Sequence, residues 1–128
     1  MSEEQFNSDI RSYDVHTYFF QSYGPSKQEG HALREKFQVD FAKEIDTGKV
    51  RVFKFHDYPL GPHPYGMWEC DFRTQEMFAK VVPWFQINHG SLSVLVHPHT
   101  GDGYKDHTHH AMWIGKQVPL IEEILKVQ

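Results

Sequence analysis

Histidines are concentrated in one short stretch, "HPHTGDGYKDHTHH" (97–110), which holds five of the chain's ten. Histidine changes its protonation state near neutral pH, and its neutral ring nitrogens bind metals. The stretch is therefore a candidate for metal binding or for proton transfer. It is equally consistent with a polar loop that has no chemical role. Which interpretation holds depends on whether these histidines meet others from elsewhere in the chain.

The bulk properties of the chain restrict its class and its partners. It has 128 residues, a formal net charge of −4 and 15% aromatic residues, which predicts one domain over 1–128 with an aromatic core. There is no basic stripe and no apolar run of about 18 residues, so neither nucleic acid nor a membrane is an expected partner. The acidic start is unlike a targeting signal, and the single Cys70 excludes an internal disulfide. We therefore expect a cytoplasmic protein.

Hydrophobic periodicity predicts two main helices and a short third one. The first covers about 27–46 and begins with a capping box formed by Ser26 and Glu29. The second follows Thr74 as its N-cap, and Pro83 is expected to kink or split it. The third lies in a C-terminal extension. Its apolar stripe consists of Leu120, Ile121, Ile124 and Leu125.

Four further segments, rich in β-branched and aromatic residues, are typical of strands: 12–20, 49–58, 67–72 and 91–97. With the two main helices they give the order β-α-β-β-α-β, which predicts a ferredoxin-like α+β sandwich. Its antiparallel sheet has four strands in the order 4-1-3-2, and both helices cover one face. We expect a substrate cleft on the other face. Residues 1–11 are predicted to be a frayed lead-in.

Side chains alternate along a strand, so their parity assigns them to the two faces of the sheet. If the apolar sets face the helices, the opposite face carries His16, Glu69 and His97, with Asp14 and Asp71 nearby. Two histidines and a carboxylate on one side of a metal suit a non-haem Fe(II) centre that activates oxygen. We therefore predict His16, His97 and Glu69 as metal ligands.

Other histidines are candidates for the same site. His63, in "GPHPYG", enters the third strand close to Glu69 and is the main substitute as a ligand. His107 and His110 are expected to move protons as general base and acid. Of the remaining two histidines in the 97–110 stretch, His99 and His109 are expected to be exposed.

Each candidate also has an interpretation without function. A histidine on a strand is more often a hydrogen-bonded polar side chain than a ligand, which applies to His16. His97 stands at a strand end, where a turn-forming hydrogen bond is the default. Glu69 can belong to the solvated face of an antiparallel sheet, and His63 can serve only to rigidify a turn.

Four blocks in the chain, "YDVHTYFF", "GPHPYGMWECDF", "LVHPHTGD" and "DHTHHAMWIG", resemble the DOPA 4,5-dioxygenase family in their sequence and order. The resemblance covers about residues 12–118. It implies a ferredoxin-like fold, a non-haem metal and extradiol cleavage of L-DOPA or a related catechol, and it implies a homodimer.

The resemblance extends to individual residues. It places five histidines on histidine-bearing motif positions, namely His16, His63, His97, His107 and His110. The chain departs from the family pattern in the first strand, where Asp14 replaces the first histidine of His-x-His. This departure puts in question which catechol the protein takes. The pattern does not decide which three residues bind the metal.

The resulting hypothesis is a dioxygenase that uses Fe(II), with a catechol and O₂ as substrates. In a crystal, another divalent metal such as zinc can take the place of the iron. The ring would open beside its hydroxyls to a muconic semialdehyde. Asp14, Tyr18 and Trp113 are expected to contact the substrate. Two alternatives remain open, a zinc or nickel module without redox chemistry and a metal-free dimeric domain that binds a small aromatic acid.

Overall fold

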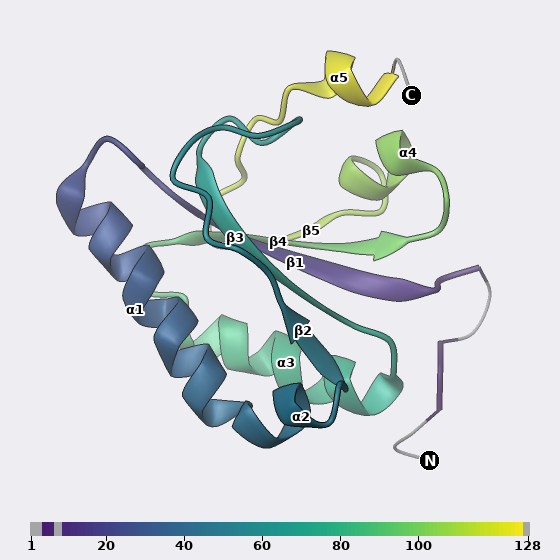
Figure 1. The fold of residues 1–128 in the computed structure, drawn as a ribbon. Coiled ribbons are helices and arrows are strands. Elements are labelled where there is room, and N and C mark those ends of the chain that lie inside the picture. The colour runs from purple at the N-terminus through teal and green to yellow at the C-terminus, as the bar shows by residue number, and fades with distance from the viewer. Residues whose placement is uncertain (1–3, 7–8, 127–128) are drawn as a thin grey trace.

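The structure, a computed structural model, describes residues 4–6 and 9–126 of the chain. One antiparallel sheet runs through the middle of the molecule, with α1 and α3 on one face and α4, α5 and connecting loops on the other (Figure 1). The α+β class predicted from the sequence is confirmed. In chain order the elements are β1 (Ser12–Phe19), α1 (Gly24–Asp40), α2 (Ala42–Asp46), β2 (Val50–Val52), β3 (Gly66–Phe72), α3 (Gln75–Asn88), β4 (Ser93–His99), α4 (Gly103–His107), β5 (Met112–Ile114) and α5 (Glu122–Lys126).

The strand order is β2-β3-β1-β4-β5. The first four strands follow the predicted order, read from the other edge of the sheet. The fifth strand was not predicted. It pairs three residues, Met112–Ile114, with β4, and so short a segment leaves no alternation in the sequence to detect.

The main core lies between the sheet and the helices. It contains the strand residues assigned to that face by parity, among them Val15, Cys70 and Val96, all fully buried. Phe37 of α1 and Phe85 of α3 pack against each other in this core, with ring centroids 5.4 Å apart. Burial of these aromatic side chains fixes which face of the sheet the helices cover.

The first helix begins earlier and ends earlier than predicted. It starts at Gly24 with Tyr23 as N-cap, and it ends at Phe41, whose dihedral angles (φ −111°, ψ 24°) are not helical, so residues 42–46 form the separate helix α2. The predicted capping box is wrong. Ser26 Oγ instead accepts a hydrogen bond from the Phe20 amide, and the Glu29 carboxylate accepts two from Ser91.

Helix α3 begins as predicted but is not split by its proline. Thr74 Oγ1 accepts a hydrogen bond from the Met77 amide, and the helix runs through Pro83 to Asn88. An interior proline costs a helix about 3 kcal/mol. Met77 and Phe85, which flank Pro83 and are both fully buried, hold the two halves of the helix on the same core.

Strand β2 is shorter than the predicted 49–58. Regular pairing with β3 stops after Val52 and resumes with an isolated bridge between His56 and Met67. Between these two points, the three residues 53–55 that follow β2 lie opposite only two residues of β3, 68 and 69. The extra residue is the feature of a β-bulge, which interrupts a ladder without ending the pairing.

The face opposite α1 and α3 is more covered than the sequence suggested. A second apolar cluster lies there, built on buried Tyr18, Met67 and Leu95 with Val118 from the C-terminal segment. The stretch "TGDGYKD" (100–106) has residues typical of a turn, but it contains most of α4, with Asp102 as N-cap. In the lead-in, Phe6 packs edge-on against Tyr13; residues 1–3 and 7–8 lie outside the described residues.

Within the described residues, no helix has both the length and the apolar character required to cross a lipid bilayer.

Candidate metal centre

The register of β1 with its two neighbours places polar side chains of three strands on one face of the sheet. Residues directly opposite each other in an antiparallel sheet point to the same face. The pairing gives two adjacent rows on that face, one of Asp71, Asp14 and His97, the other of Glu69, His16 and Leu95. The histidines of β1 and β4 are therefore diagonal neighbours.

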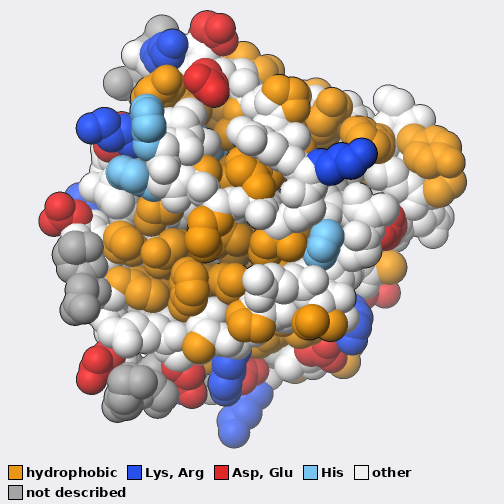
Figure 2. Space-filling view, turned by 180° about the vertical axis from the view of Figure 1, so that it is seen from behind, with side chains coloured by type: hydrophobic (Ala, Val, Ile, Leu, Met, Phe, Trp, Pro, Cys, Tyr) orange, Lys and Arg blue, Asp and Glu red, His pale blue; other side chains and the backbone are white. Residues whose placement is uncertain are grey.

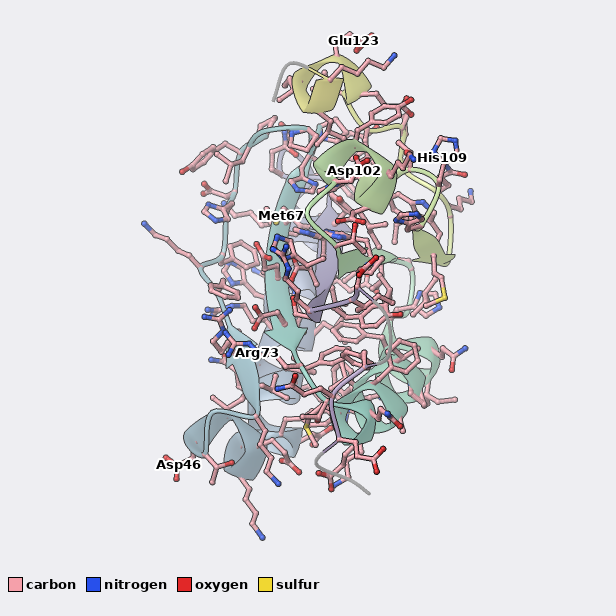
Figure 3. The ribbon with its side chains drawn as sticks, turned by 90° about the vertical axis from the view of Figure 1, so that its right-hand side faces the viewer. Asp46, Met67, Arg73, Asp102, His109 and Glu123 are labelled. Atoms are coloured by element: carbon pink, nitrogen blue, oxygen red, sulfur yellow. The ribbon has the colours of Figure 1, made fainter. Side chains whose placement is uncertain are left out.

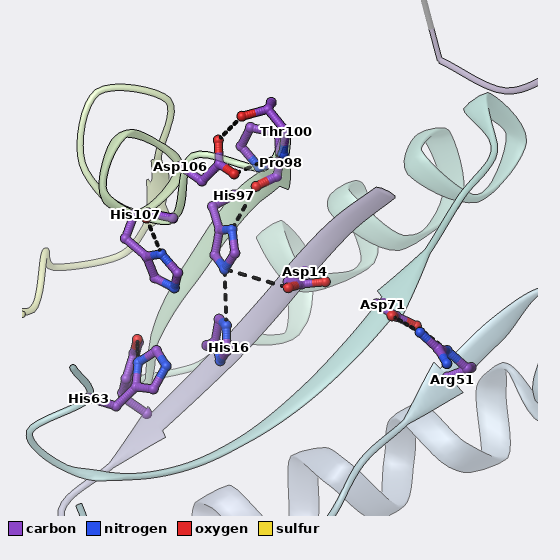
Figure 4. Close-up of polar contacts among 12 residues, drawn as sticks. Asp14, His16, Arg51, His63, Asp71, His97, Pro98, Thr100, Asp106 and His107 are labelled. Carbon is purple, nitrogen blue, oxygen red and sulfur yellow. Dashed lines mark hydrogen bonds and ion pairs between the residues drawn. The ribbon is translucent and has the colours of Figure 1, made fainter. Parts of the chain in front are cut away.

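The structure brings His16 and His97 into direct contact. Their Nε2 atoms lie 3.1 Å apart, and their rings stack with centroids 5.1 Å apart. Both side chains are buried, with exposed fractions of 4% and 2%. Asp14 completes this group, because its Oδ2 lies 3.8 Å from His97 Nε2 (Figure 4).

Two more histidines reach the same point from outside the sheet. His63 comes from the loop before β3, and its ring centroid lies 4.3 Å from that of His16. His107 comes from the last turn of α4, and its ring centroid lies 4.1 Å from that of His97. Figure 4 shows the four imidazoles converging from four separate segments of the chain.

Hydrogen bonds to the second ring nitrogen orient three of these imidazoles. Nδ1 of His97 donates to the Pro98 carbonyl (2.8 Å), and Nδ1 of His107 donates to the Gly103 carbonyl (2.7 Å). Since a carbonyl oxygen only accepts, Nε2 of each ring keeps its lone pair. The Tyr18 hydroxyl lies 2.6 Å from His63 Nδ1.

Burial keeps three of the clustered histidines, His16, His63 and His97, neutral. Burial first, and the charged forms of neighbouring histidines second, lower the pKa of His63 to about 3 and that of His97 to about 4. The pKa of His16 lies well below its ordinary value for the same reasons. A metal requires the neutral form of an imidazole, so these rings are ready to act as ligands at neutral pH.

The described residues contain two groups of three side chains whose ligand atoms all lie within 4.8 Å of one another: Asp14, His16 and His97, and His16, His63 and His107. His16 belongs to both, and its buried Nδ1 has no hydrogen-bond partner in the structure. A cluster of imidazoles beside a carboxylate and an orphaned buried nitrogen fits a transition metal. The histidine cluster can therefore hold a metal ion.

Glu69, expected as a ligand, belongs to neither group, although it is the cross-strand partner of His16. It lines a neighbouring pocket of about 560 Å³ together with Asp14 and Asp71. Burial and the charges of Asp14 and Asp71 raise the pKa of Glu69 to about 7, and burial and Asp71 raise that of Asp14 to about 6. Asp71 itself is paired with Arg51 (Figure 4).

His110, expected to work beside His107, is held elsewhere. Its Nδ1 lies 3.0 Å from Asp106 Oδ1, and its ring is exposed. Asp106 is buried and also accepts hydrogen bonds from the amide and hydroxyl of Thr100. Sequence reasoning missed Asp106. Asp102 as a helix N-cap after "TG" is the signal that would have revealed a helix here.

The aromatic residues expected to contact a substrate lie beside the cluster. Tyr18 is only 3% exposed and stacks on Trp113 of β5, with ring centroids 5.9 Å apart. Sequence reasoning missed that Tyr18 also contacts His63. His99 and His109 are exposed, as predicted. In Figure 3, His109 and Asp102 mark the two ends of the segment around α4, which covers this side of the sheet.

The fold and site define an α+β protein with four imidazoles and a carboxylate that can hold a metal on one face of its sheet. Comparison with known proteins identifies the family. The model of the Dopa 4,5-dioxygenase family matches residues 13–124, so the chain belongs to that family.

Relatives and a solved structure agree with this assignment. The chain is 37% identical to an uncharacterized 21.2 kDa protein of Botryotinia fuckeliana, over 96% of this chain and 68% of that protein. It is 33% identical to a DOPA 4,5-dioxygenase of Amanita muscaria over 89% of its length, but spans only about half (49%) of that relative. A crystal structure of a putative dioxygenase from Nostoc punctiforme superposes with a TM-score of 0.80, at 34% identity and with 93% and 94% of the two chains covered. The protein is a dioxygenase-like enzyme.

Proposed function

We propose that this protein is an extradiol dioxygenase that opens the ring of L-DOPA or a related catechol with O₂. Four imidazoles meeting at one point beside a carboxylate are the single observation that carries the proposal. In the reaction both atoms of O₂ enter the product, and the carbon–carbon bond next to the two hydroxyls is cleaved to a muconic semialdehyde. Membership of the Dopa 4,5-dioxygenase family supports this chemistry.

The proposed metal is Fe(II), with Asp14, His16 and His97 as its ligands. This group is the two-histidine, one-carboxylate set that suits non-haem iron and oxygen. It keeps the ligand chemistry predicted from the sequence, but Asp14 takes the place of Glu69. Held there, Fe(II) supplies a Lewis acid for the catechol hydroxyls and electrons for O₂.

The other two histidines are proposed to handle protons. His107 Nε2 carries a lone pair because Nδ1 donates to Gly103, so this nitrogen can accept a proton from a catechol hydroxyl. His63 faces the same point and is held by Tyr18. His110 bonds to Asp106 and is given no direct role.

Iron content and oxygen uptake, measured on the same samples, test the proposal. We expect anaerobic protein loaded with Fe(II) to consume one O₂ per L-DOPA and to form a yellow product when air is admitted. His16→Ala and His97→Ala should each lose the iron, whereas His63→Ala and His107→Ala should keep it and lose turnover. His109→Ala, which changes an exposed histidine outside the cluster, is the matched control.

Other outcomes overturn specific parts of this proposal. Bound metal without oxygen uptake for any of several catechols would favour a module without redox chemistry. Ligand binding that is indifferent to chelators would favour the metal-free domain. Loss of iron in His63→Ala and His107→Ala, with iron retained in His97→Ala, would move the metal to the second group of ligands.

We also propose that the protein forms a homodimer through the free edge of β5. This strand ends the sheet, and its Met112 is 44% exposed. Figure 2 shows hydrophobic side chains gathered in the middle of the face that carries β5. An exposed strand edge beside apolar side chains is a template for pairing with another chain.

A further inference from the structure

The C-terminal segment, residues 117–126, crosses the side of the sheet that holds the histidine cluster. It follows β5, passes beside the loop before β3 and ends as α5 on the side of α4 away from the sheet (Figure 1). The loop before β3 carries His63, and α4 carries His107. The segment therefore lies against both of the elements that bring histidines to the cluster from outside the sheet.

The first attachment of this segment is to the apolar cluster beside the site. Val118 is buried in the same cluster as Tyr18, and Leu120 packs against that cluster. Tyr18 is also the residue whose hydroxyl lies 2.6 Å from His63 Nδ1. Burial of the Val118 side chain therefore fixes the beginning of the segment next to the hydrogen-bond partner of His63.

The second attachment is to the turn that carries His63. Two backbone hydrogen bonds between Leu60 and His63, of 3.1 and 3.0 Å, close this turn. Among the described residues, two hydrogen bonds join the turn to the rest of the chain. One links the Tyr18 hydroxyl to His63, and in the other the Ile121 amide donates to the Pro62 carbonyl at 2.8 Å. The segment thus holds the residue next to His63.

The third attachment is to α4. Leu125 of α5 is buried, and it lines a crevice together with Gly103 and Tyr104 of α4. Lys126 Nζ lies 5.4 Å from the centroid of the Tyr104 ring, within the range of a cation–π interaction. A helix of five residues does not keep its place without such contacts, so α5 helps to fix the element that carries His107.

The proposed metal ligands do not depend on this segment. Asp14 and His16 stand on β1 and His97 on β4, and these two strands pair with each other within the sheet. Strand pairing sets the positions of their side chains. His63 and His107 stand on a turn and on a short helix, so their positions depend on what packs against those elements.

We infer that residues 117–126 form a strap that positions His63 and His107 at the metal centre. The strap acts on His63 through the Pro62 carbonyl and on His107 through α4. Catalytic groups must be held precisely, because a misplacement of about 1 Å can cost a reaction about a hundredfold in rate. The use of the two histidines in proton transfer rests on the proposed function. Ile121 and Leu125 are positioning residues, since they act through other groups.

The imidazole nitrogens themselves test this inference without metal or turnover. In metal-free protein labelled with ¹⁵N-histidine, the NMR shifts of each ring at a fixed pH depend on its tautomer and its hydrogen bonds. Ile121→Pro removes the amide that donates to Pro62, so the His63 signals should shift. Leu125→Ala removes a buried contact of α5, so the His107 signals should shift or broaden. The signals of His16 and His97 should stay as in the wild-type protein.

Matched variants separate positioning from a general loss of structure. Glu122→Pro places a proline one residue further on, at the start of α5, where a missing amide is tolerated, and it should leave all signals unchanged. Leu125→Met keeps the buried volume and should restore the wild-type signals. Lys126→Gln removes only the charge above Tyr104 and should shift the His107 signals by less than Leu125→Ala does.

Turnover provides an independent readout once iron is loaded. Ile121→Pro and Leu125→Ala should each lower kcat about tenfold while the iron content stays at the wild-type level. Unchanged His63 and His107 signals in both variants, or equal changes in all four clustered histidines, would overturn the inference even if catechols are cleaved. Changes confined to His63 and His107, without cleavage of any catechol by the wild-type protein, would instead overturn only the proposed function.

Discussion

At the scale of single residues, the site depends on groups that do not face the proposed metal, one side-chain hydroxyl and two backbone carbonyls. Tyr18, Pro98 and Gly103 each bond to one ring nitrogen of a clustered histidine and leave the other nitrogen to the site. Such partners set the orientation and the tautomer of an imidazole. Substitutions that remove these hydrogen-bond partners should therefore lower the activity of the cluster.

Tyr18→Phe tests this dependence. The variant keeps the ring that packs on Trp113 but removes the hydroxyl 2.6 Å from His63 Nδ1. If His63 handles a proton, turnover should fall by about 10–100-fold while the iron content is unchanged. Steady-state oxygen uptake and iron analysis measure the two effects. Tyr65→Phe, in the same apolar cluster, is the control; a loss of iron in Tyr18→Phe would instead indicate that His63 is a ligand.

Glu69 should make the stability of the metal-free protein depend on pH. Its pKa is about 7 in the folded state against 4.5 in the unfolded chain, so the folded state binds the extra proton between these values. The stability due to this proton is complete below about pH 4.5 and is lost as the pH rises through 7.

Glu69→Gln, which cannot ionise, should therefore gain unfolding free energy relative to the wild-type protein on going from pH 5 to pH 8. We expect a gain of about 1–2 kcal/mol after allowance for solvent screening. Urea unfolding at the two pH values measures it. Glu122→Gln, an exposed carboxylate of α5, should show no such gain, and an equal gain in both variants would contradict the prediction.

At the scale of elements, α4 is the segment that brings His107 to the sheet. The helix has only five residues and is too short to be stable by itself. It is tied to the end of β4 by Asp106, which accepts two hydrogen bonds from Thr100 and contacts His110. The position of His107 therefore depends on one buried carboxylate.

Asp106→Ala should destabilise the protein by about 2–4 kcal/mol, because it removes three hydrogen bonds to a charged group and leaves the half-buried Thr100 donors without a partner. Turnover should fall with it, since His107 loses its support. Chemical denaturation and oxygen uptake measure the two effects. Asp102→Ala removes only the N-cap of the same helix and should cost about 1 kcal/mol. Similar losses in both variants would show that Asp106 has no special role.

At the scale of the whole molecule, the sheet separates two environments. The helix-covered face holds the main core, and the opposite face holds the histidine cluster, the charged pocket and a smaller apolar cluster. The sheet ends at β5, where apolar side chains reach the surface (Figure 2). The proposed dimer uses this edge.

Light scattering after size exclusion tests the dimer. The wild-type protein should elute at twice the mass of the chain, and Met112→Lys should shift it to the monomer, because a lysine on a strand edge opposes pairing. Val39→Lys changes a residue of α1 that is 74% exposed, and should leave the dimer intact. A monomeric wild-type protein would rule out this assembly.

The sequence by itself determined the class of fold and the face of the sheet on which the site lies. Strand parity depends only on local geometry, so it placed Asp14, His16 and Glu69 on the face opposite the apolar core. The histidines of the loops were identified from the family motifs. These motifs keep the same residue types in loops, where hydrophobic periodicity predicts nothing.

Tertiary structure decided which of these residues meet. Parity cannot show that His63 and His107 fold back over the sheet, or that Glu69 faces the charged pocket, because loop paths depend on long-range contacts such as those of Asp106 and Tyr18. For the same reason the sequence missed β5, and of the two effects expected of Pro83, a kink or a split, the split does not occur. Burial of side chains from distant segments outweighs a local preference of a few kcal/mol, and that balance is set only when the whole chain packs.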